Sequence, residues 1–328
     1  MRTGRGSRFS PPETFEDFSP ILIAGPTAVG KSAVAVALAQ RIGAEIISVD
    51  SMQVYCGLDI GTAKPSPTER RGVRHHLIDI VDLTEPFDAA RFARLAHAAV
   101  GDARKRGRVP ILCGGTGLYF KAFLEGLGES PPADAALRAE LEATPLPELH
   151  RELERRDPIT FAKIDRKNPR RVIRAVEVVR LTGRPFSAQR SRWNPAPGPR
   201  SAESFLGLTR SGSDLRTRID TRVEDMFARG LVRETERLLE RGLAANQTAM
   251  QAIGYRQVVE HLRGERSLAD TIALVKQRTR QFARRQMTWF GRQFSLQWLD
   301  LEPSTSPDSA AEQVLKRCSF SRKDGAGA

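Results

Sequence analysis

The chain has 328 residues, of which 40% are hydrophobic and 28% charged, and this composition is typical of a globular protein large enough to bury a full core. No apolar stretch reaches the roughly 20 residues that a membrane-spanning helix needs, so we do not expect a membrane protein. The 52 Lys and Arg residues against 39 Asp and Glu residues give a formal net charge of +13, which suits a polyanionic partner such as RNA or DNA but also occurs in generally basic proteomes.

A phosphate-binding loop is the first motif in the chain. Residues 1–20 contain several arginines and no apolar signal core, and we expect them to form a disordered arm. A short buried strand is expected at Ile21–Ala24, followed by GPTAVGKS at Gly25–Ser32 and then by a helical pattern of apolar residues. The spacing GxxxxGKS allows successive backbone N–H groups to point at oxyanions, with Lys31 on the terminal phosphates and Ser32 on a magnesium ion. A phosphate ligand is therefore predicted, but the motif does not decide whether it is ATP.

Alternating strands and helices predict the fold class. Beyond the first strand, further strands are expected at Glu45–Val49, His76–Val81, Val109–Cys113 and Phe205–Leu208. This order predicts an α/β protein with a parallel sheet and helices on both faces. The ligand site should then lie at the carboxyl ends of the strands.

The middle of the chain interrupts this alternation. After a polar, proline-containing break at Glu129–Pro132, no strand signal appears before about Arg192, and the pattern predicts helices at Asp134–Thr144, Pro147–Arg156 and Asn168–Leu181. We interpret this segment as a helical insertion that returns to the sheet through a linker at Trp193–Ser204. The expected organisation is an arm (1–20), the first part of the core (21–128), the insertion and linker (129–204), the completion of the core (205–300) and a tail without clear organisation (301–328).

Three later segments are candidates for the site. Asp50, in SVDSMQVY, follows the second strand, where it could position magnesium, accept a proton or only cap the next turn. The loop GLDIGTAKP, Gly57–Pro65, is either a recognition element or a connection. In CGGTGLYF, three glycines surround Thr116 and would let the backbone approach a ligand closely, although glycine also permits tight packing between a strand and a helix.

The motifs resemble, in their order, those of the bacterial tRNA dimethylallyltransferases, the MiaA or IPP transferase family. The segments that carry the resemblance are GPTAVGKS, SVDSMQVY, GLDIGTAKP, CGGTGLYFKAFLEGL, NPRRVIRAVEV, IGYRQ and TRQFARRQMTWF, and the likeness runs from about Ile21 to Leu299. It implies a P-loop NTPase-like parallel sheet with an all-helical insertion domain. It also implies transfer of a dimethylallyl group from dimethylallyl diphosphate to N6 of the adenosine at tRNA position 37, beside the anticodon, so that the loop would hold the diphosphate of an isoprenoid.

The resemblance implies roles for individual residues. Catalytic roles fall to Asp50, Thr116 and Arg218, with Asp50 as the base, because the exocyclic amine of adenine is a poor nucleophile. The diphosphate would be held by Gly25, Thr27, Ala28, Gly30, Lys31, Ser32 and Arg222, with Mg²⁺ as cofactor on Ser32. The tRNA anticodon stem-loop, with its target nucleotide flipped out, would be bound by Asp50, Ser51, Met52, Gln53, Arg170, Arg171, Arg174, Gly254, Tyr255, Arg256, Arg284, Arg285 and Gln286.

Further expectations and alternatives accompany this interpretation. The resemblance suggests a monomer, and three widely spaced cysteines, which predict neither a disulfide framework nor a metal site, fit a reducing cytosol. The alternatives are an adenylate isopentenyltransferase that acts on free AMP, ADP or ATP, a small-molecule P-loop kinase, and an RNA-binding NTPase switch. The first of these would leave the basic helix at Lys276–Arg292 without a function.

Overall fold

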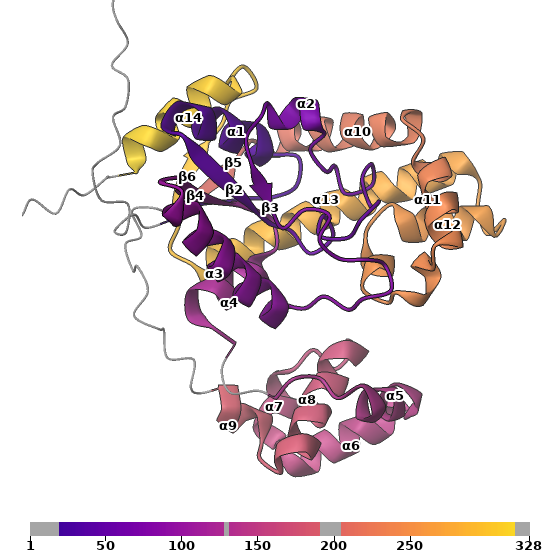
Figure 1. Ribbon diagram of the computed structural model, residues 1–328. Helices are drawn as coiled ribbons and strands as arrows, with labels where there is room; N and C mark the ends of the chain where they lie inside the picture. Colours follow the sequence, from indigo (N-terminus) through magenta and orange to yellow (C-terminus); the bar gives the residue numbers. More distant parts are fainter. Residues whose placement is uncertain (1–19, 128–130, 191–204, 319–328) are drawn as a thin grey trace, which may run out of the picture. The chain divides into compact units, whose positions relative to one another are not determined.

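The computed structural model describes residues 20–127, 131–190 and 205–318 (Figure 1). The predicted arm and the predicted linker therefore lie almost entirely outside the described residues. The chain divides into two compact units: the smaller is formed within Leu124–Gly198, and the larger is formed by the rest of the chain.

A parallel sheet forms the centre of the larger unit. Its six strands have the order β3-β2-β4-β1-β5-β6, and all neighbouring pairs are parallel. The strands are β1 (Ile21–Ala24), β2 (Ala44–Val49), β3 (His75–His76), β4 (Val109–Gly114), β5 (Phe205–Thr209) and β6 (Gln297–Asp300). Strands β1, β2 and β4 are buried along their whole length, as expected for a sheet covered on both sides. The predicted parallel sheet is confirmed.

Strand β3 is much shorter than the strand expected at His76–Val81. Only His75 and His76 pair with β2. The chain then turns because Leu77 and Asp79 adopt left-handed conformations, with φ angles of 61° and 54°, which no strand can accommodate. That part of the prediction was wrong.

Helices cover both faces of the sheet (Figure 1). Helices α1 (Lys31–Ile42) and α14 (Pro307–Arg317) pack on one face, where their buried residues share a core with alternate residues of the strands. Helices α3 (Ala89–Lys105) and α4 (Gly117–Glu125) lie on the other face, where Phe120 of α4 contacts Phe205 of β5.

Helix α14 corrects the expectation of an unorganised tail after Pro303. Ser306 caps the helix by accepting a hydrogen bond from the N–H of Ser309, and a proline occupies the first turn. The small side chains of Ala310 and Ala311 are fully buried against α1. The prediction was wrong because a short helix whose inner face consists largely of alanine gives only a weak apolar pattern.

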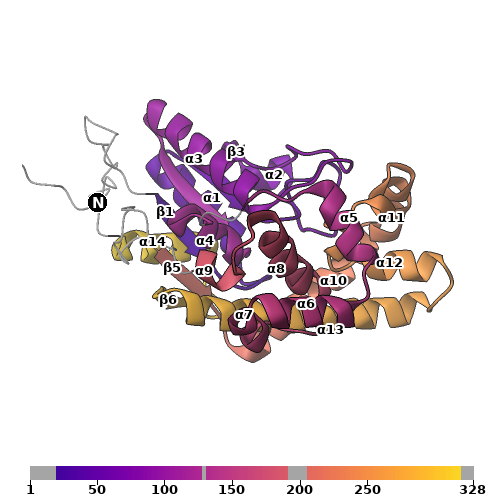
Figure 2. The same cartoon turned by 90° about the horizontal axis from the view of Figure 1, so that it is seen from below.

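Four longer helices complete the larger unit. They are α10 (Gly212–Ala228), α11 (Leu231–Glu240), α12 (Tyr255–Leu262) and α13 (Leu268–Gln293), accompanied by the short helices α2 (Pro67–Arg70), η3 (Leu243–Ala245) and η4 (Ala249–Gln251). Helices α10 and α13 lie side by side (Figures 1 and 2), joined by the ion pairs Lys276–Glu224 and Arg280–Asp220. Within the described residues, no helix combines the length and the apolar character needed to cross a bilayer.

The smaller unit is helical in its described part. It contains α5 (Ala135–Ala143), α6 (Leu146–Arg156), α7 (Pro158–Lys163), α8 (Pro169–Thr182) and α9 (Phe186–Arg190), and the three helices predicted here are confirmed. Leu141, Leu149 and Val172 belong to its small apolar core. The buried Glu177 accepts hydrogen bonds from Arg138 and Arg174.

Candidate active site

The loop between β1 and α1 has the backbone geometry of an anion-binding nest. Gly25, Ala28 and Gly30 have φ angles of 148°, 66° and 110°, so the backbone changes hand repeatedly and its N–H groups can converge. A Cβ atom on Gly25 would lie 2.5 Å from the carbonyl oxygen of Leu208, which is why glycine is required there. Helix α1 starts without a capping side chain, so the N–H groups of its first turn are available to an anion.

Three cationic side chains hold carbonyl oxygens of this loop. Lys31 Nζ donates to Pro26 O at 2.7 Å, and Arg218 Nε donates to Ala28 O at 2.9 Å. Arg210 Nε donates to Val29 O at 2.8 Å. Because these carbonyl groups are occupied by cations, the loop can turn N–H groups toward a ligand rather than oxygens. Two of its N–H groups are already used within the fold, since Thr27 donates to Gln286 and Val29 donates to Pro26 O.

Sequence analysis missed Arg210. Its side chain is 4% exposed, forms an ion pair with Asp214 at 2.8 Å and donates a further hydrogen bond to the carbonyl oxygen of Glu302. The only sequence signal was its position directly after a buried strand, at the carboxyl edge of the sheet where parallel sheets bind ligands.

Four cations, Lys31, Arg210, Arg218 and Arg222, gather at the loop. In the described part of the chain only Arg210 of these four forms an ion pair, with Asp214, while Glu69 and Asp225 act on Arg222 without direct contact. Burial lowers the pKa of Lys31 to about 8, an effect that Arg222 increases and the carboxylate of Asp50 opposes. Burial also lowers the pKa of Arg222, and the neighbouring Arg218 lowers it further. In the described part of the chain, the Arg222 side chain has no hydrogen bond and no ion pair. An anion beside them would stabilise such partly desolvated cations, so the arrangement suits the predicted anion site.

The lowered pKa of Lys31 leads to a prediction about proton uptake. A bound anion raises the pKa of Lys31 from about 8, so pyrophosphate binding above that pH should take up a proton and should weaken as the pH rises. Calorimetric titrations in buffers of different ionisation enthalpy measure this uptake. Lys31→Met is the matched control, because the titration of pyrophosphate itself is common to both proteins. Equal proton uptake and equal pH profiles in the two proteins would contradict the prediction.

Asp50 lies at the carboxyl end of β2 and uses only one of its oxygens in the fold. Its Oδ1 accepts hydrogen bonds from the N–H groups of Met52 at 2.8 Å and Gln53 at 3.2 Å, so it caps the turn, one of the roles left open by the sequence. In the described part of the chain, Oδ2 has no hydrogen-bond partner. The carboxylate can therefore cap the turn and accept a proton at the same time.

Thr116 and Asp50 are brought together at the same edge of the sheet. Thr116 Oγ1 accepts a hydrogen bond from the N–H of Ser51 at 3.1 Å, and its own N–H donates to Val49 O at 3.2 Å. Since β4 lies between β2 and β1, this pair is next to the phosphate loop. The structure thus places the predicted catalytic residues Asp50, Thr116 and Arg218 around one site.

The glycines beside Thr116 serve packing. A Cβ atom on Gly114 would lie 2.0 Å from Val49 O, and one on Gly117 would lie 2.1 Å from the Trp289 ring. Helix α13 and strand β2 thus approach this loop so closely that no side chain fits, which supports the packing alternative for these glycines.

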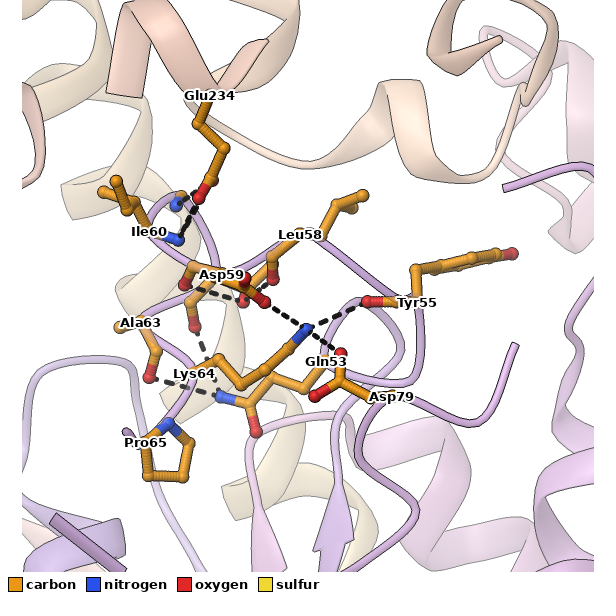
Figure 3. A network of polar contacts seen from close by, with 12 residues as sticks. Gln53, Tyr55, Leu58, Asp59, Ile60, Ala63, Lys64, Pro65, Asp79 and Glu234 are labelled. Atoms are coloured by element: carbon orange, nitrogen blue, oxygen red, sulfur yellow. Dashed lines mark hydrogen bonds and ion pairs between the residues drawn. The ribbon is translucent and has the colours of Figure 1, made fainter. Parts of the chain in front are cut away.

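The segment Gly57–Pro65 is fixed by a network of polar contacts around the buried Lys64 and Glu234 (Figure 3). Lys64 Nζ donates to Tyr55 O at 2.9 Å and contacts the carboxylates of Asp59 and Asp79. Glu234 of α11 accepts hydrogen bonds from the N–H groups of Ile60 and Gly61. The segment therefore has a conformation that is fixed by specific contacts and is not a loose connection.

Two residues expected to contact tRNA belong to this network. The Gln53 amide donates to Thr62 O and Ala63 O. Tyr255 is completely buried, and its hydroxyl donates to Glu234 at 2.5 Å and accepts a hydrogen bond from the Gly61 N–H. In this geometry the two side chains shape the loop, and their contact with tRNA stays a prediction. Ser51 and Met52 are partly buried beside Asp50, and Gly254 is the N-cap of α12 with a φ angle of 105°.

The predicted tRNA-binding arginines differ in their availability. Arg174 is engaged by Glu177, and Arg256 pairs with Glu260. On α13, Lys276 and Arg280 pair with α10, as noted above. Gln286 is buried, with 7% of its surface exposed. The predicted residues that are exposed and have no ion pair in the described part are Arg170, Arg171, Arg284 and Arg285.

Ser32, the residue predicted to bind a magnesium ion, faces a small pocket. Its side chain is exposed in the first turn of α1 and lines a small pocket together with Ser48, Gln53, His75 and Cys113. Among the described residues, no group of three or more His, Cys, Asp or Glu side chains could form a cage for a metal. A single hydroxyl fits Mg²⁺, which usually keeps several waters and takes its other ligands from phosphate oxygens.

Comparisons with known proteins agree with this geometry. The model of the IPP transferase family matches residues 53–293. A protein from Geobacter metallireducens named tRNA dimethylallyltransferase is 47% identical over 85% of this chain and 92% of its own length. A protein of the same name from Geobacillus kaustophilus is 43% identical over 90% of this chain and 94% of its own length.

Solved structures are similar as well. The crystal structure of a tRNA isopentenylpyrophosphate transferase from Bacillus halodurans matches with a TM-score of 0.66 and 39% identity, covering 90% of this chain and 94% of that one. A eukaryotic dimethylallyltransferase acting on tRNA matches with a TM-score of 0.76 and 30% identity, covering 90% of this chain and 76% of that one. The predicted P-loop NTPase-like fold is thereby confirmed.

Proposed function

Since this chain belongs to the IPP transferase family, we propose that it transfers a dimethylallyl group from dimethylallyl diphosphate to N6 of the adenosine at tRNA position 37, next to the anticodon. The observation that carries the proposal is the juxtaposition of a phosphate-type loop, beside which Lys31, Arg218 and Arg222 have no ion pair in the described residues, with an aspartate that has a free oxygen. Such a site can hold a diphosphate leaving group and, at the same edge of the sheet, accept a proton from a nucleophile. The relatives named tRNA dimethylallyltransferase favour this reaction over transfer to free adenylate or phosphoryl transfer.

The chain's own residues divide the reaction between them. In the transfer, the bond between C1 of the allyl group and the diphosphate oxygen breaks, and a bond between C1 and N6 forms. Lys31, Arg218 and Arg222 stabilise the negative charge that develops on the diphosphate. Asp50 takes the proton from N6, which makes the amine a better nucleophile. Thr116 orients the turn that carries Asp50 through its hydrogen bond with Ser51.

A magnesium ion is the cofactor that we propose for this site. Bound to the Ser32 hydroxyl and to diphosphate oxygens, it would supply further positive charge for the leaving group. We also propose a monomer, because Lys31, Thr116 and Arg218 come together at the loop without a residue from a second chain being needed for any of their hydrogen bonds. Free thiols at Cys56, Cys113 and Cys318 support a reducing compartment such as the cytoplasm.

A transfer assay tests the proposed function directly. The protein is incubated with Mg²⁺, labelled dimethylallyl diphosphate and one of three acceptors: an unmodified anticodon stem-loop with A37, the same stem-loop with G37, or AMP. We expect label only in the A37 stem-loop, since only this RNA offers the N6 amine at that position. Label in AMP alone would indicate an adenylate isopentenyltransferase. In a parallel incubation with ATP, phosphate release without alkylation would indicate a kinase or an NTPase switch.

Exposed cations on α13 supply the proposed tRNA contact. Replacing Arg284 and Arg285 by alanine should weaken binding of the stem-loop and reduce the slope of log K against log salt by about one unit per lost phosphate contact. Filter binding at several salt concentrations measures the slope. Arg317→Ala, which removes an exposed arginine from α14, is the control. An unchanged slope in the double variant would mean that these side chains do not meet RNA phosphates.

A further inference from the structure

A single buried amide connects the phosphate loop to the loop that carries Thr116. Gln286 of α13 accepts a hydrogen bond from the N–H of Thr27 through Oε1, at 2.8 Å, and donates one from Nε2 to Gly115 O, at 2.9 Å. The orientation of the amide is fixed by its partners, because a backbone N–H can only donate and a carbonyl can only accept. The two loops follow neighbouring strands, because Ala24 of β1 pairs with Gly114 of β4, and Gln286 bridges them just beyond the end of that pairing.

Neighbouring residues make room for this amide and hold it in place. A Cβ atom on Gly115 would lie 2.4 Å from Gln286 Nε2, so the glycine makes room for the contact. The neighbouring buried residues Ala283 and Phe290 fix α13 on either side of Gln286. The amide therefore has little freedom to leave its position.

One end of this connection lies at the loop proposed to hold the diphosphate, and the other lies beside the proposed base. Thr27 belongs to the loop that receives the diphosphate. Gly115 precedes Thr116, whose hydroxyl holds the Ser51 N–H next to Asp50. The strand pairing fixes where the two loops begin, and beyond it Gln286, which belongs to neither loop, joins them through its two hydrogen bonds.

We propose that Gln286 is a positioning residue that sets the separation between the diphosphate loop and the Asp50–Thr116 pair. The proposal rests on the proposed function, because the separation matters for catalysis only if the loop holds the diphosphate and Asp50 is the base. It also differs from the sequence prediction, which placed Gln286 among the contacts with tRNA. Only a side chain with an acceptor and a donor on one short planar group can make both bonds, so neither an apolar residue nor a carboxylate can replace it.

The variant Gln286→Met keeps the approximate volume of the side chain and removes both hydrogen bonds. Its control is Gln277→Met, the same change at an exposed position of the same helix. For Gln286→Met we expect pyrophosphate to bind about 5- to 50-fold more weakly by calorimetry, because the Thr27 N–H is no longer held. We expect single-turnover transfer to slow by about 10- to 100-fold, because the reacting groups are misplaced. Stem-loop affinity by filter binding should stay within about twofold of the unchanged protein.

A second variant gives a readout that a purely structural role would not affect. In Gln286→Glu, the carboxylate can accept from Thr27 but cannot donate to Gly115, whereas the protonated acid can do both. The ratio of pyrophosphate dissociation constants between Gln286→Glu and the unchanged protein should therefore decrease as the pH is lowered from about 8 to about 6. Thermal melting establishes that each variant is folded, and if Gln286→Met is not, the pH series on Gln286→Glu decides.

Two results would overturn the inference. One is weaker stem-loop binding in Gln286→Met with unchanged pyrophosphate affinity and unchanged transfer rate at saturating RNA, which would make Gln286 an RNA contact. The other is a pH-independent ratio for Gln286→Glu. Failure of the proposed function is a separate outcome: the unchanged protein would transfer no label, while the pyrophosphate measurements would still report on Gln286.

Discussion

Replacing Asp50 by asparagine should slow prenyl transfer by about 10²- to 10⁴-fold, the usual contribution of a general base, while pyrophosphate and the stem-loop bind as before. The structure explains the choice of variant. Asparagine keeps the oxygen that accepts hydrogen bonds from Met52 and Gln53, so the turn after β2 is preserved. It loses only the basic oxygen Oδ2. Alanine at this position would lose the turn as well and would mix two effects.

Single-turnover transfer with saturating substrates measures this loss, because it reports the chemical step without product release. Asp102→Asn is a suitable control, since Asp102 is an exposed acid on α3, 57% exposed in its side chain. Pyrophosphate and stem-loop affinities of Asp50→Asn should be measured in parallel. Full activity in Asp50→Asn would remove Asp50 from the role of base.

Replacing Arg222 by methionine should weaken pyrophosphate binding by about 10- to 100-fold and should at the same time stabilise the free protein. The loss in affinity corresponds to about 1.5–3 kcal/mol, the value of a hydrogen bond to a charged group. The gain in stability follows because burial is the largest influence on the guanidinium and lowers its pKa, an effect that Arg218 increases and that the nearby Glu69 and Asp225 only partly oppose. Methionine occupies a similar volume without the repulsion, a trade between stability and function that is common at binding sites.

Thermal melting with and without pyrophosphate checks both effects of Arg222→Met. The melting temperature of the free variant should rise, and the increase caused by pyrophosphate should shrink. Arg216→Met provides the matched control, because Arg216 is exposed on the same helix. A less stable free variant with unchanged affinity would show that Arg222 supports the fold and not the ligand.

Sequence predicted those parts of the molecule that depend on local pattern. The phosphate loop was recognisable because its spacing is set by the backbone, and β1, β2 and β4 were recognisable because strands covered on both faces are continuous apolar runs. The end of β3 could not be predicted in this way. Its turn depends on Asp79, which is held by Lys64 from a segment earlier in the chain.

The roles of single residues were also difficult to predict where they depend on partners that are distant in the chain. Sequence singled out Gln286 but could not place it, because its partners Thr27 and Gly115 are far away in the chain. Arg210 belongs to no motif, and its importance appears only when the loop carbonyl of Val29 lies beside it. Among basic residues, composition could not separate Arg284, which is exposed, from Arg280, which is paired with Asp220.

The burial of α1 under α14 has a consequence for synthesis of the protein. The phosphate loop and α1 leave the ribosome early, but α14, which covers α1, and Arg210 and Arg218, which hold the loop carbonyls, follow much later. Co-translational folding therefore cannot complete the site until almost the whole described chain has emerged. A truncated product that stops before α14 should leave the apolar face of α1 open to chaperones and proteases.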